Sequence, residues 1–287
     1  MKKLISIGEY FAKDGYFFKT RSWGNEAKFN MVANMKSSQH GVIVVGQPKT
    51  GNHLCMSMLD MLGCDRAEEI GDPNGINSQP FEDQPNIGAY ARMEQKMEDA
   101  RKYTILPHAH IQAQYFPTTF HGKIIHVTRD PRAVAVSGYP FFGSIPHWQP
   151  YFDVWGFANV NDWARHDVEG HFYNGDIDDY DAQWRKIAKE RNYDILFITF
   201  EDIVSNKEET IRKVAQFLGI NDYKMSDVVN GMSLAATVAR RQAKFDAAGV
   251  DFRERRCYRT GQIGSWREEL SDEMKAAYRA KYPRLGE

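Results

Sequence analysis

The chain has 287 residues, a length that suits one large α/β domain or two small ones. Its 37 Lys and Arg residues nearly balance 38 Asp and Glu residues, so the overall basic surplus typical of non-specific nucleic-acid binding is missing. Hydrophobic residues make up 42% of the chain, and no apolar run approaches the ~20 residues that a membrane span needs. We therefore predict a soluble protein that binds neither nucleic acid nor a membrane.

The cysteines and the first residues bear on location. Cys55, Cys64 and Cys257 cannot all pair within one chain and fit no C-x-x-C metal spacing, which favours reduced thiols in the cytoplasm. The first apolar stretch is broken by Gly8 and Glu9 before a signal sequence could form, so we expect no targeting signal.

Short β-branched runs alternate with helical patterns along the chain. Strands are predicted over 41–46, 103–106, 123–128 and 194–200, a surface loop over 63–88, and helices over 54–63, 94–101, 131–137 and 206–219. This alternation predicts an α/β fold with a central parallel sheet flanked by helices, and sites at the C-terminal ends of the strands. We expect a single domain over 1–287, with residues 1–39 as an N-terminal arm packed on it.

A polar loop from Gln47 to His53 joins the first predicted strand to a helix. Such a loop offers free backbone N–H groups and the positive end of the helix dipole, which together bind phosphate or sulfate. Lys49 adds a full charge, and Gly51 permits close approach of the backbone. Side-chain donors stand at Thr50, Asn52 and His53. The loop predicts an anion site, with a turn carrying a solvated lysine as the alternative.

Gly46 and Gly51 have the glycine spacing of the P-loop G-x-x-x-x-G-K-[ST]. Asn52 and His53 replace its lysine and its Mg²⁺-binding hydroxyl, and the lysine stands earlier, at Lys49. The run from 48 to 53 resembles the loop Pro-Lys-Ser/Thr-Gly-Thr/Asn of the sulfotransferases that use 3′-phosphoadenosine 5′-phosphosulfate (PAPS). In that family the loop holds the 5′-phosphosulfate.

A second motif strengthens the resemblance. The predicted strand 123–128 ends at Arg129, followed by Asp130 and Pro131, and Ser137 stands eight residues after the arginine. The family has an arginine and a serine at this spacing, and both bind the 3′-phosphate. A guanidinium offers a planar fork of donors that suits a phosphate dianion. A salt bridge between Arg129 and Asp130 or another carboxylate is the alternative.

Further family motifs follow with departures. Phe200, which opens Phe-Glu-Asp-Ile, stands where the family has tyrosine, so a hydroxyl contact is lost. The run from 259 to 266 resembles the family's last motif, whose arginine and glycine contact the 3′-phosphate. Cofactor contacts carried over by the resemblance fall on Leu54, at the family's stacking tryptophan, and on Ser233, Leu234, Arg259, Thr260, which replaces a lysine, and Gly261.

The resemblance implies PAPS as sulfuryl donor, 3′-phosphoadenosine 5′-phosphate (PAP) as product and no metal. Lys49 is then the candidate for the bridging oxygen. His110 aligns with the family's histidine base and His108 with its lysine, and which of the two is the base stays open. A histidine at its unperturbed pKa of ~6.5 accepts a proton at neutral pH. Two histidines on one face also suit a metal, but we find no third ligand. The alternative is that His108 and His110 are simply exposed to solvent.

The acceptor side is predicted between the second motif and the fourth strand. This segment is rich in aromatic residues, and residues 162–181 carry seven carboxylates against one arginine. Aromatic faces with carboxylates favour a cationic guest such as an amine or guanidinium alkaloid. A solvated acidic loop is the alternative. The basic side chains of Arg240, Arg241 and Lys244 are interpreted as part of a solvated loop.

We predict a sulfotransferase that moves a sulfuryl group from PAPS to a hydroxyl or amine of a small molecule. The alternatives are a P-loop small-molecule kinase, which the missing Gly-Lys-Ser/Thr disfavours, and a non-catalytic nucleotide-binding module, which the departures at Leu54, Phe200 and Thr260 allow. The identity of the acceptor, O- versus N-sulfation and the oligomeric state stay open.

Overall fold

The computed structural model describes residues 40–66, 103–105, 110, 112–116, 118, 120–145, 148–170, 176–247 and 258–285. The expected N-terminal arm, the helix predicted over 94–101, most of the loop predicted over 63–88, and His108 lie outside these residues.

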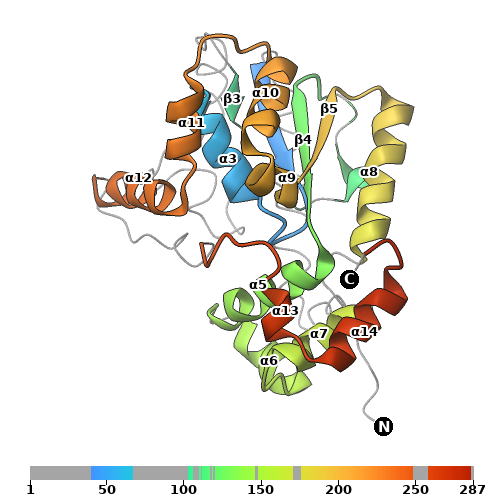
Figure 1. The fold of residues 1–287 in the computed structure, drawn as a ribbon. Helices are drawn as coiled ribbons and strands as arrows, with labels where there is room; N and C mark the ends of the chain where they lie inside the picture. The colour runs from blue at the N-terminus through green and yellow to red at the C-terminus, as the bar shows by residue number, and fades with distance from the viewer. Residues whose placement is uncertain are drawn as a thin grey trace, which may run out of the picture.

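Five parallel strands form one sheet in the order β2, β3, β1, β4, β5 (Figure 1). The strands are β1 (Gly41–Val45), β2 (Asp65–Arg66), β3 (Thr104–Ile105), β4 (Lys123–Thr128) and β5 (Ile195–Thr199). The four predicted strands are confirmed, with ends that shift by one or two residues. The short strand β2 was not predicted, because its two residues lie in a stretch that reads as loop.

The strand order sets the place of the site. From β1 the chain moves to β2 and β3 on one side, and it then returns as β4 on the other side, with Val45 of β1 paired to His126 of β4. The loops that follow β1 and β4 therefore leave the same edge of the sheet as neighbours. This change of direction is where parallel α/β sheets bind ligands.

Helices follow most of the strands. They are α3 (Asn52–Met61), α5 (Pro131–Gly143), α6 (Gln149–Trp155), α7 (Val160–Val168), α8 (Ile177–Arg191), α9 (Phe200–Ser205), α10 (Lys207–Leu218), α11 (Met225–Gly231), α12 (Leu234–Ala247), α13 (Trp266–Glu269) and α14 (Asp272–Lys281). The helices predicted after the first, third and fourth strands are confirmed as α3, α5 and α10. None of the described helices has both the length and the apolar character that crossing a membrane requires.

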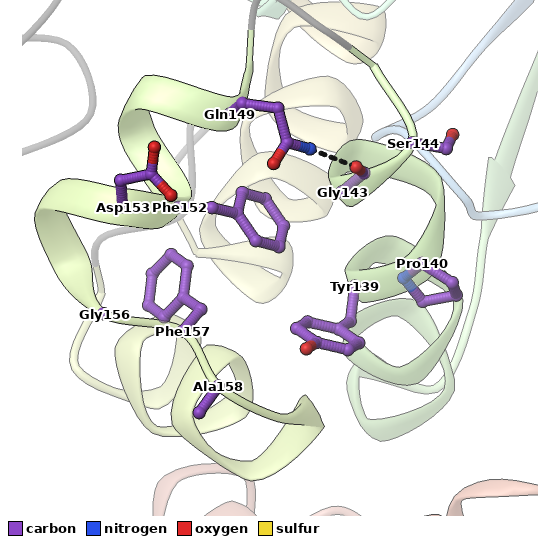
Figure 2. A pocket seen from close by; sticks show the side chains of 10 residues that line it. All are labelled: Tyr139, Pro140, Gly143, Ser144, Gln149, Phe152, Asp153, Gly156, Phe157 and Ala158. Atoms are coloured by element: carbon purple, nitrogen blue, oxygen red, sulfur yellow. Dashed lines mark hydrogen bonds between the residues drawn. The ribbon is translucent and has the colours of Figure 1, made fainter.

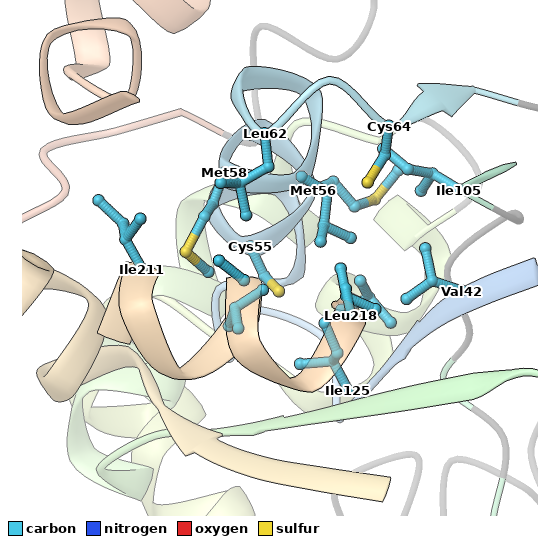
Figure 3. Close-up of a cluster of buried hydrophobic side chains, with 14 of the residues drawn as sticks. Val42, Cys55, Met56, Met58, Leu62, Cys64, Ile105, Ile125, Ile211 and Leu218 are labelled. Atoms are coloured by element: carbon cyan, nitrogen blue, oxygen red, sulfur yellow. The ribbon is translucent and has the colours of Figure 1, made fainter. Parts of the chain in front are cut away.

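One face of the sheet packs against α3, α10 and α11. Val42 of β1 and Ile125 of β4 point to this face and meet Cys55 of α3 and Ile211 and Leu218 of α10 (Figure 3). All five side chains are buried. Burial of each large aliphatic side chain stabilises the fold by about 1.5–3 kcal/mol, so this cluster fixes α3, and with it the loop at its N-terminus, against the sheet.

The opposite face buries a histidine. His126 is only 1% exposed and lies among the rings of Tyr180, Trp184 and Phe197, with centroids 5.1–6.0 Å away. Its Nε2 lies 3.3 Å from a carboxylate oxygen of Asp181. Burial lowers the pKa of His126 to about 3, so the ring is neutral at physiological pH.

A second core lies beyond the C-terminal end of β4, where α5, α6, α7, α13 and α14 gather (Figure 1). Trp148, Tyr151 and Trp163 are among its largest side chains, and each is at most 1% exposed. Three of the aromatic residues in the predicted acceptor segment are therefore core residues. An aromatic side chain buries about 150–250 Å², and this burial stabilises the fold.

His126 gives a pH prediction. Between pH 6.5 and 3 the unfolded state binds about one more proton at this position than the folded state, so His126 by itself contributes a loss of stability of about 1.4 kcal/mol per pH unit as the pH is lowered. His126→Phe, which suits the aromatic surroundings, should flatten that slope in urea unfolding at pH 7, 6, 5 and 4. His121→Phe, at an exposed position, is the matched control. An unchanged slope in His126→Phe would contradict the assignment.

Candidate active site

The loop between β1 and α3 turns on two glycines. A Cβ on Gly46 would lie 2.4 Å from the carbonyl oxygen of Val127 on the neighbouring strand. Gly51 has φ 110°, and a Cβ there would lie 2.8 Å from Cδ2 of Phe200. Real Cβ atoms do not approach so closely, so both positions require glycine. The spacing read from the sequence thus has a steric basis.

Polar side chains brace this loop from inside. Thr50 Oγ1 donates to the carbonyl of Gln47 at 2.7 Å, and Asn52 Nδ2 donates to the carbonyl of Gly46 at 3.4 Å. Thr50 and Asn52 are only 1% and 4% exposed. In this structure their side chains therefore hold the shape of the loop, and its outward surface belongs to the backbone and to Lys49.

Lys49 occupies a backbone conformation that is uncommon for a residue with a side chain. Its φ is 71°, in the left-handed region, which costs roughly 1–2 kcal/mol for a residue other than glycine. The Nζ atom lies 4.0 Å from the centroid of the Phe141 ring on α5. Strain of this kind persists only where surrounding contacts fix the backbone, and it is concentrated at functional sites.

His110 lies against the base of the same loop. Its Nδ1 is 2.7 Å from the carbonyl oxygen of Gly46 and 3.4 Å from Nδ2 of Asn52. A carbonyl only accepts, so the shorter contact requires a proton on Nδ1, and in the neutral ring the lone pair then lies on Nε2. The tertiary structure thus joins His110, which stands far from the loop in sequence, to the phosphosulfate motif.

Arg129 follows β4 and reaches across to this loop. Nη1 donates to the carbonyl of Lys49 at 3.1 Å, and Nη2 donates to the carbonyl of Gln262 at 3.5 Å. The guanidinium lies 3.9 Å above the Phe200 ring. Burial lowers the pKa of Arg129 to about 10, so the group stays charged at neutral pH.

Asp130, one of the carboxylates considered as a partner of Arg129, pairs with a different arginine. The carboxylate of Asp130 pairs with Arg132 through contacts of 2.8–3.1 Å, and the Arg132 guanidinium lies 3.6 Å from the Trp266 ring. Asp130 also caps α5 by accepting from the backbone N–H of Arg132. Sequence reasoning missed Arg132, which ties the second motif to the last one.

The last motif folds against Arg129. Arg259 Nη1 donates to both carboxylate oxygens of Glu269, at 2.8 and 2.9 Å, and the charge of Arg259 contributes to the lowered pKa of Arg129. Gly261 turns the chain at φ 65°, next to the Gln262 carbonyl that Arg129 contacts. The exposed Thr260 accepts from the backbone N–H of Gln262 at 3.4 Å. The two motifs assigned to the 3′-phosphate therefore converge.

The remaining predicted residues lie on α3, on α5 and at the start of α12. Ser137 is 9% exposed and lies nearly two turns into α5. Ser233 Oγ accepts from the backbone N–H of Ala236 at the start of α12, and Leu234 is exposed. His53 packs edge to face on Tyr258 with centroids 5.8 Å apart. Leu54 is half-buried on α3.

The solvated loop expected around Arg240, Arg241 and Lys244 is wrong. These residues lie on α12, where Arg241 is only 3% exposed, although Lys244 does face solvent. Arg240 donates to the carbonyl of Gly231 at 3.0 Å and to Ser57 Oγ of α3 at 2.7 Å. An amphipathic helix buries its apolar side against the protein, and the basic residues next to that side can hydrogen-bond to neighbouring helices.

The carboxylates of residues 162–181 mostly bind the chain's own donors. Asp167 accepts from Tyr278 at 2.5 Å, and Asp176 accepts from Tyr282 at 2.9 Å and pairs with Lys281. Further pairs link Asp178 to Arg284 and Asp162 to Arg165. These contacts attach the segment to α14. The carboxylates that suggested a cationic acceptor are therefore used mainly within the chain.

A pocket of about 790 Å³ lies between α5 and α6 (Figure 2). Its aromatic walls are Tyr139, Phe152 and Phe157, and Asp153 stands at its rim. Residues 139, 140, 143 and 144 at the end of α5 line the pocket, whereas Phe141, which Lys49 contacts, is not among the lining residues.

In the described part of the chain, no three His, Cys, Asp or Glu side chains are grouped to hold a metal ion. The groups that converge at the C-terminal ends of β1 and β4 are instead cationic side chains, backbone amides and one histidine. Such a set suits an anion with two separate phosphate-like ends.

Comparison with known proteins agrees with this chemistry. Residues 39–284 match the family model of the sulfotransferase domain. Sulfotransferase 2A1 of Macaca fascicularis is 26% identical over 251 residues, which cover 83% of this chain and 81% of the relative. The chain therefore belongs to the sulfotransferase domain family. Within it, the chain is a PAPS-dependent sulfotransferase.

Solved structures share the fold. Mouse sulfotransferase SULT7A1 complexed with PAP has a TM-score of 0.66 at 17% identity, covering 91% of this chain and 88% of that one. A retinol dehydratase in complex with retinol and PAP has a TM-score of 0.59 at 14% identity, covering 92% and 86%. The predicted α/β class, with a P-loop-like loop after the first strand, is confirmed.

Gly51→Ala tests the loop. The new Cβ would collide with Phe200 and disfavour φ 110°, so the loop should lose its anion-binding shape. We expect PAP affinity in calorimetry to fall at least tenfold. Gly219→Ala is the control, because Gly219 also has positive φ, 65°, but its Cβ would meet nothing within 4 Å. Equal PAP binding by the two variants would contradict this steric account.

Proposed function

We propose that this chain binds PAPS between Lys49 and Arg129 and transfers its sulfuryl group to a hydroxyl or amine of a small molecule, with His110 as general base. The observation that carries the proposal is the contact of Arg129 Nη1 with the Lys49 carbonyl, because it brings the two motifs assigned to opposite ends of the donor into one site. We also propose that the described residues act as one domain and, from the buried free thiols of Cys55 and Cys64, that the enzyme works in the cytoplasm.

The residues present fit a nucleotide with two anionic ends. Arg129 is 9% exposed, and its Nε has no hydrogen-bond partner among the described residues, which is costly unless a ligand supplies an acceptor. A 3′-phosphate would supply it. At the other end, Gly46 and Gly51 leave a turn that any Cβ would fill. The backbone N–H groups at the start of α3 then serve the 5′-phosphosulfate.

The residues also fit sulfuryl transfer. PAPS supplies an activated sulfuryl group whose transfer leaves negative charge on the departing phosphate. Lys49 Nζ is the full charge on the loop and would stabilise that developing charge. His110 would accept the proton of the acceptor's O–H or N–H at Nε2, since Nδ1 is held by the Gly46 carbonyl. His108 remains the alternative base in sequence.

Two other functions make different predictions. A small-molecule kinase would require Mg²⁺ and ATP, and Asn52 and His53 stand where such a site has its lysine and its Mg²⁺-binding hydroxyl. A non-catalytic module would bind PAP without transferring sulfate. The fixed tautomer of His110 against the loop favours catalysis over binding alone.

Labelled-sulfate transfer from PAPS to a panel of phenols, aliphatic alcohols and amines tests the activity. We expect Mg²⁺-independent transfer to at least one acceptor class. A cationic acceptor preference stays a prediction, and faster turnover of neutral phenols would remove it. PAP binding with no transfer to any acceptor would favour the non-catalytic module, whereas phosphoryl transfer from ATP would favour the kinase.

His110→Asn tests the base. The amide keeps an N–H donor near the position of Nδ1 for the Gly46 carbonyl but removes the basic nitrogen. We expect kcat to fall by about 10²–10⁴-fold while PAP affinity stays within about threefold. His121→Asn, at an exposed position, should leave kcat unchanged. A His110→Asn enzyme with full activity would refute His110 as the base.

A further inference from the structure

The contact between Arg129 and Lys49 is made to the backbone of Lys49. Nη1 of Arg129 donates to the Lys49 carbonyl oxygen at 3.1 Å. The peptide unit is planar, so a donor held on that oxygen fixes the orientation of the whole peptide between Lys49 and Thr50. Lys49 is also the residue at φ 71°, where a side chain is disfavoured.

Arg129 is itself held rigidly. Its guanidinium lies 3.9 Å from the Phe200 ring, it is 9% exposed, and Nη2 reaches the Gln262 carbonyl at 3.5 Å. The same Phe200 ring closes over the Cα of Gly51, at the far end of the Lys49 turn. The ring and the guanidinium together therefore enclose the turn from Lys49 to Gly51.

We infer that Arg129 is a positioning residue for the Lys49 turn as well as a ligand of the 3′-phosphate, so that one guanidinium couples the two ends of the donor. This inference rests on the proposed function. A guanidinium carries five N–H groups, and two of them go to the carbonyls of Lys49 and Gln262. Nε–H and two more remain for a phosphate, so both roles are compatible. A phosphate that immobilises Arg129 also immobilises the backbone that carries the Lys49 ammonium.

Adenosine 5′-monophosphate (AMP) separates the two roles, because it lacks the 3′-phosphate. If Arg129 only binds that phosphate, Arg129→Leu weakens PAP binding and leaves AMP binding unchanged. If it also positions the turn, Arg129→Leu weakens AMP binding at least fivefold in calorimetry. Arg259→Leu is the matched control: it removes the same charge close to Arg129, but its side chain bonds Glu269 and Ser265 instead of the loop. We expect it to change AMP affinity less than twofold.

Two further variants keep the test decisive if Arg129→Leu folds poorly, which thermal melting reports. Phe200→Leu removes the ring that supports Arg129 without removing a charge and should weaken AMP binding at least threefold. In a Lys49→Gly background, glycine adopts the positive φ without needing the Arg129 contact. Arg129→Leu should then lower the AMP affinity less than twofold.

The outcomes separate this inference from the proposed function. AMP binding unchanged within twofold in both Arg129→Leu and Phe200→Leu, with PAP binding reduced to the level of AMP, would overturn the positioning role and leave the proposed function standing. A wild-type protein that binds PAP no more tightly than AMP would overturn the proposed function, and the inference would fall with it.

Discussion

The guanidinium of Arg129 is the point at which three separate parts of the chain meet. It touches the Lys49 turn after β1, the Phe200 ring at the start of α9 and the Gln262 carbonyl of the last motif. A buried cation is costly to desolvate, and carbonyl dipoles, an aromatic face and the nearby charges of Glu201 and Asp130 offset part of that cost. Under the proposed function, a bound 3′-phosphate would offset more of it.

The layers of the fold keep this point rigid. One core fixes α3 against the sheet, and the second core fixes α5 beyond the end of β4. Lys49 precedes α3, and Arg129 precedes α5, so each functional side chain stands next to an anchored helix. A site whose residues lie next to the first turns of anchored helices keeps its geometry more precisely than a site on long loops. The Asp130–Arg132–Trp266 stack then attaches the last motif to the same frame.

Carboxylates and basic residues that stood out in the sequence turned out to serve packing. Asp167 and Asp176 bind the tyrosines of the C-terminal segment, and Arg240 clamps α11 and α3. Composition cannot distinguish a carboxylate facing a ligand from one facing its own chain, since both uses require the same residue type. Partners more than 100 residues away decide between them, and no local pattern reports such partners.

The sequence by itself determined four of the five strands, the glycine spacing of the loop and the order of the family motifs. The strand pattern is a local property, because β-branched runs form buried strands, whereas the lack of room for a Cβ at Gly46 and Gly51 comes from Val127 and Phe200 on other elements. The tertiary structure alone decided three contacts. Arg129 donates to the Lys49 carbonyl, Arg132 pairs with Asp130, and His110 Nδ1 donates to the Gly46 carbonyl. The physical reason is that β1 and β4 become neighbours only when the sheet assembles, and only then do residues 80 positions apart share one hydrogen bond.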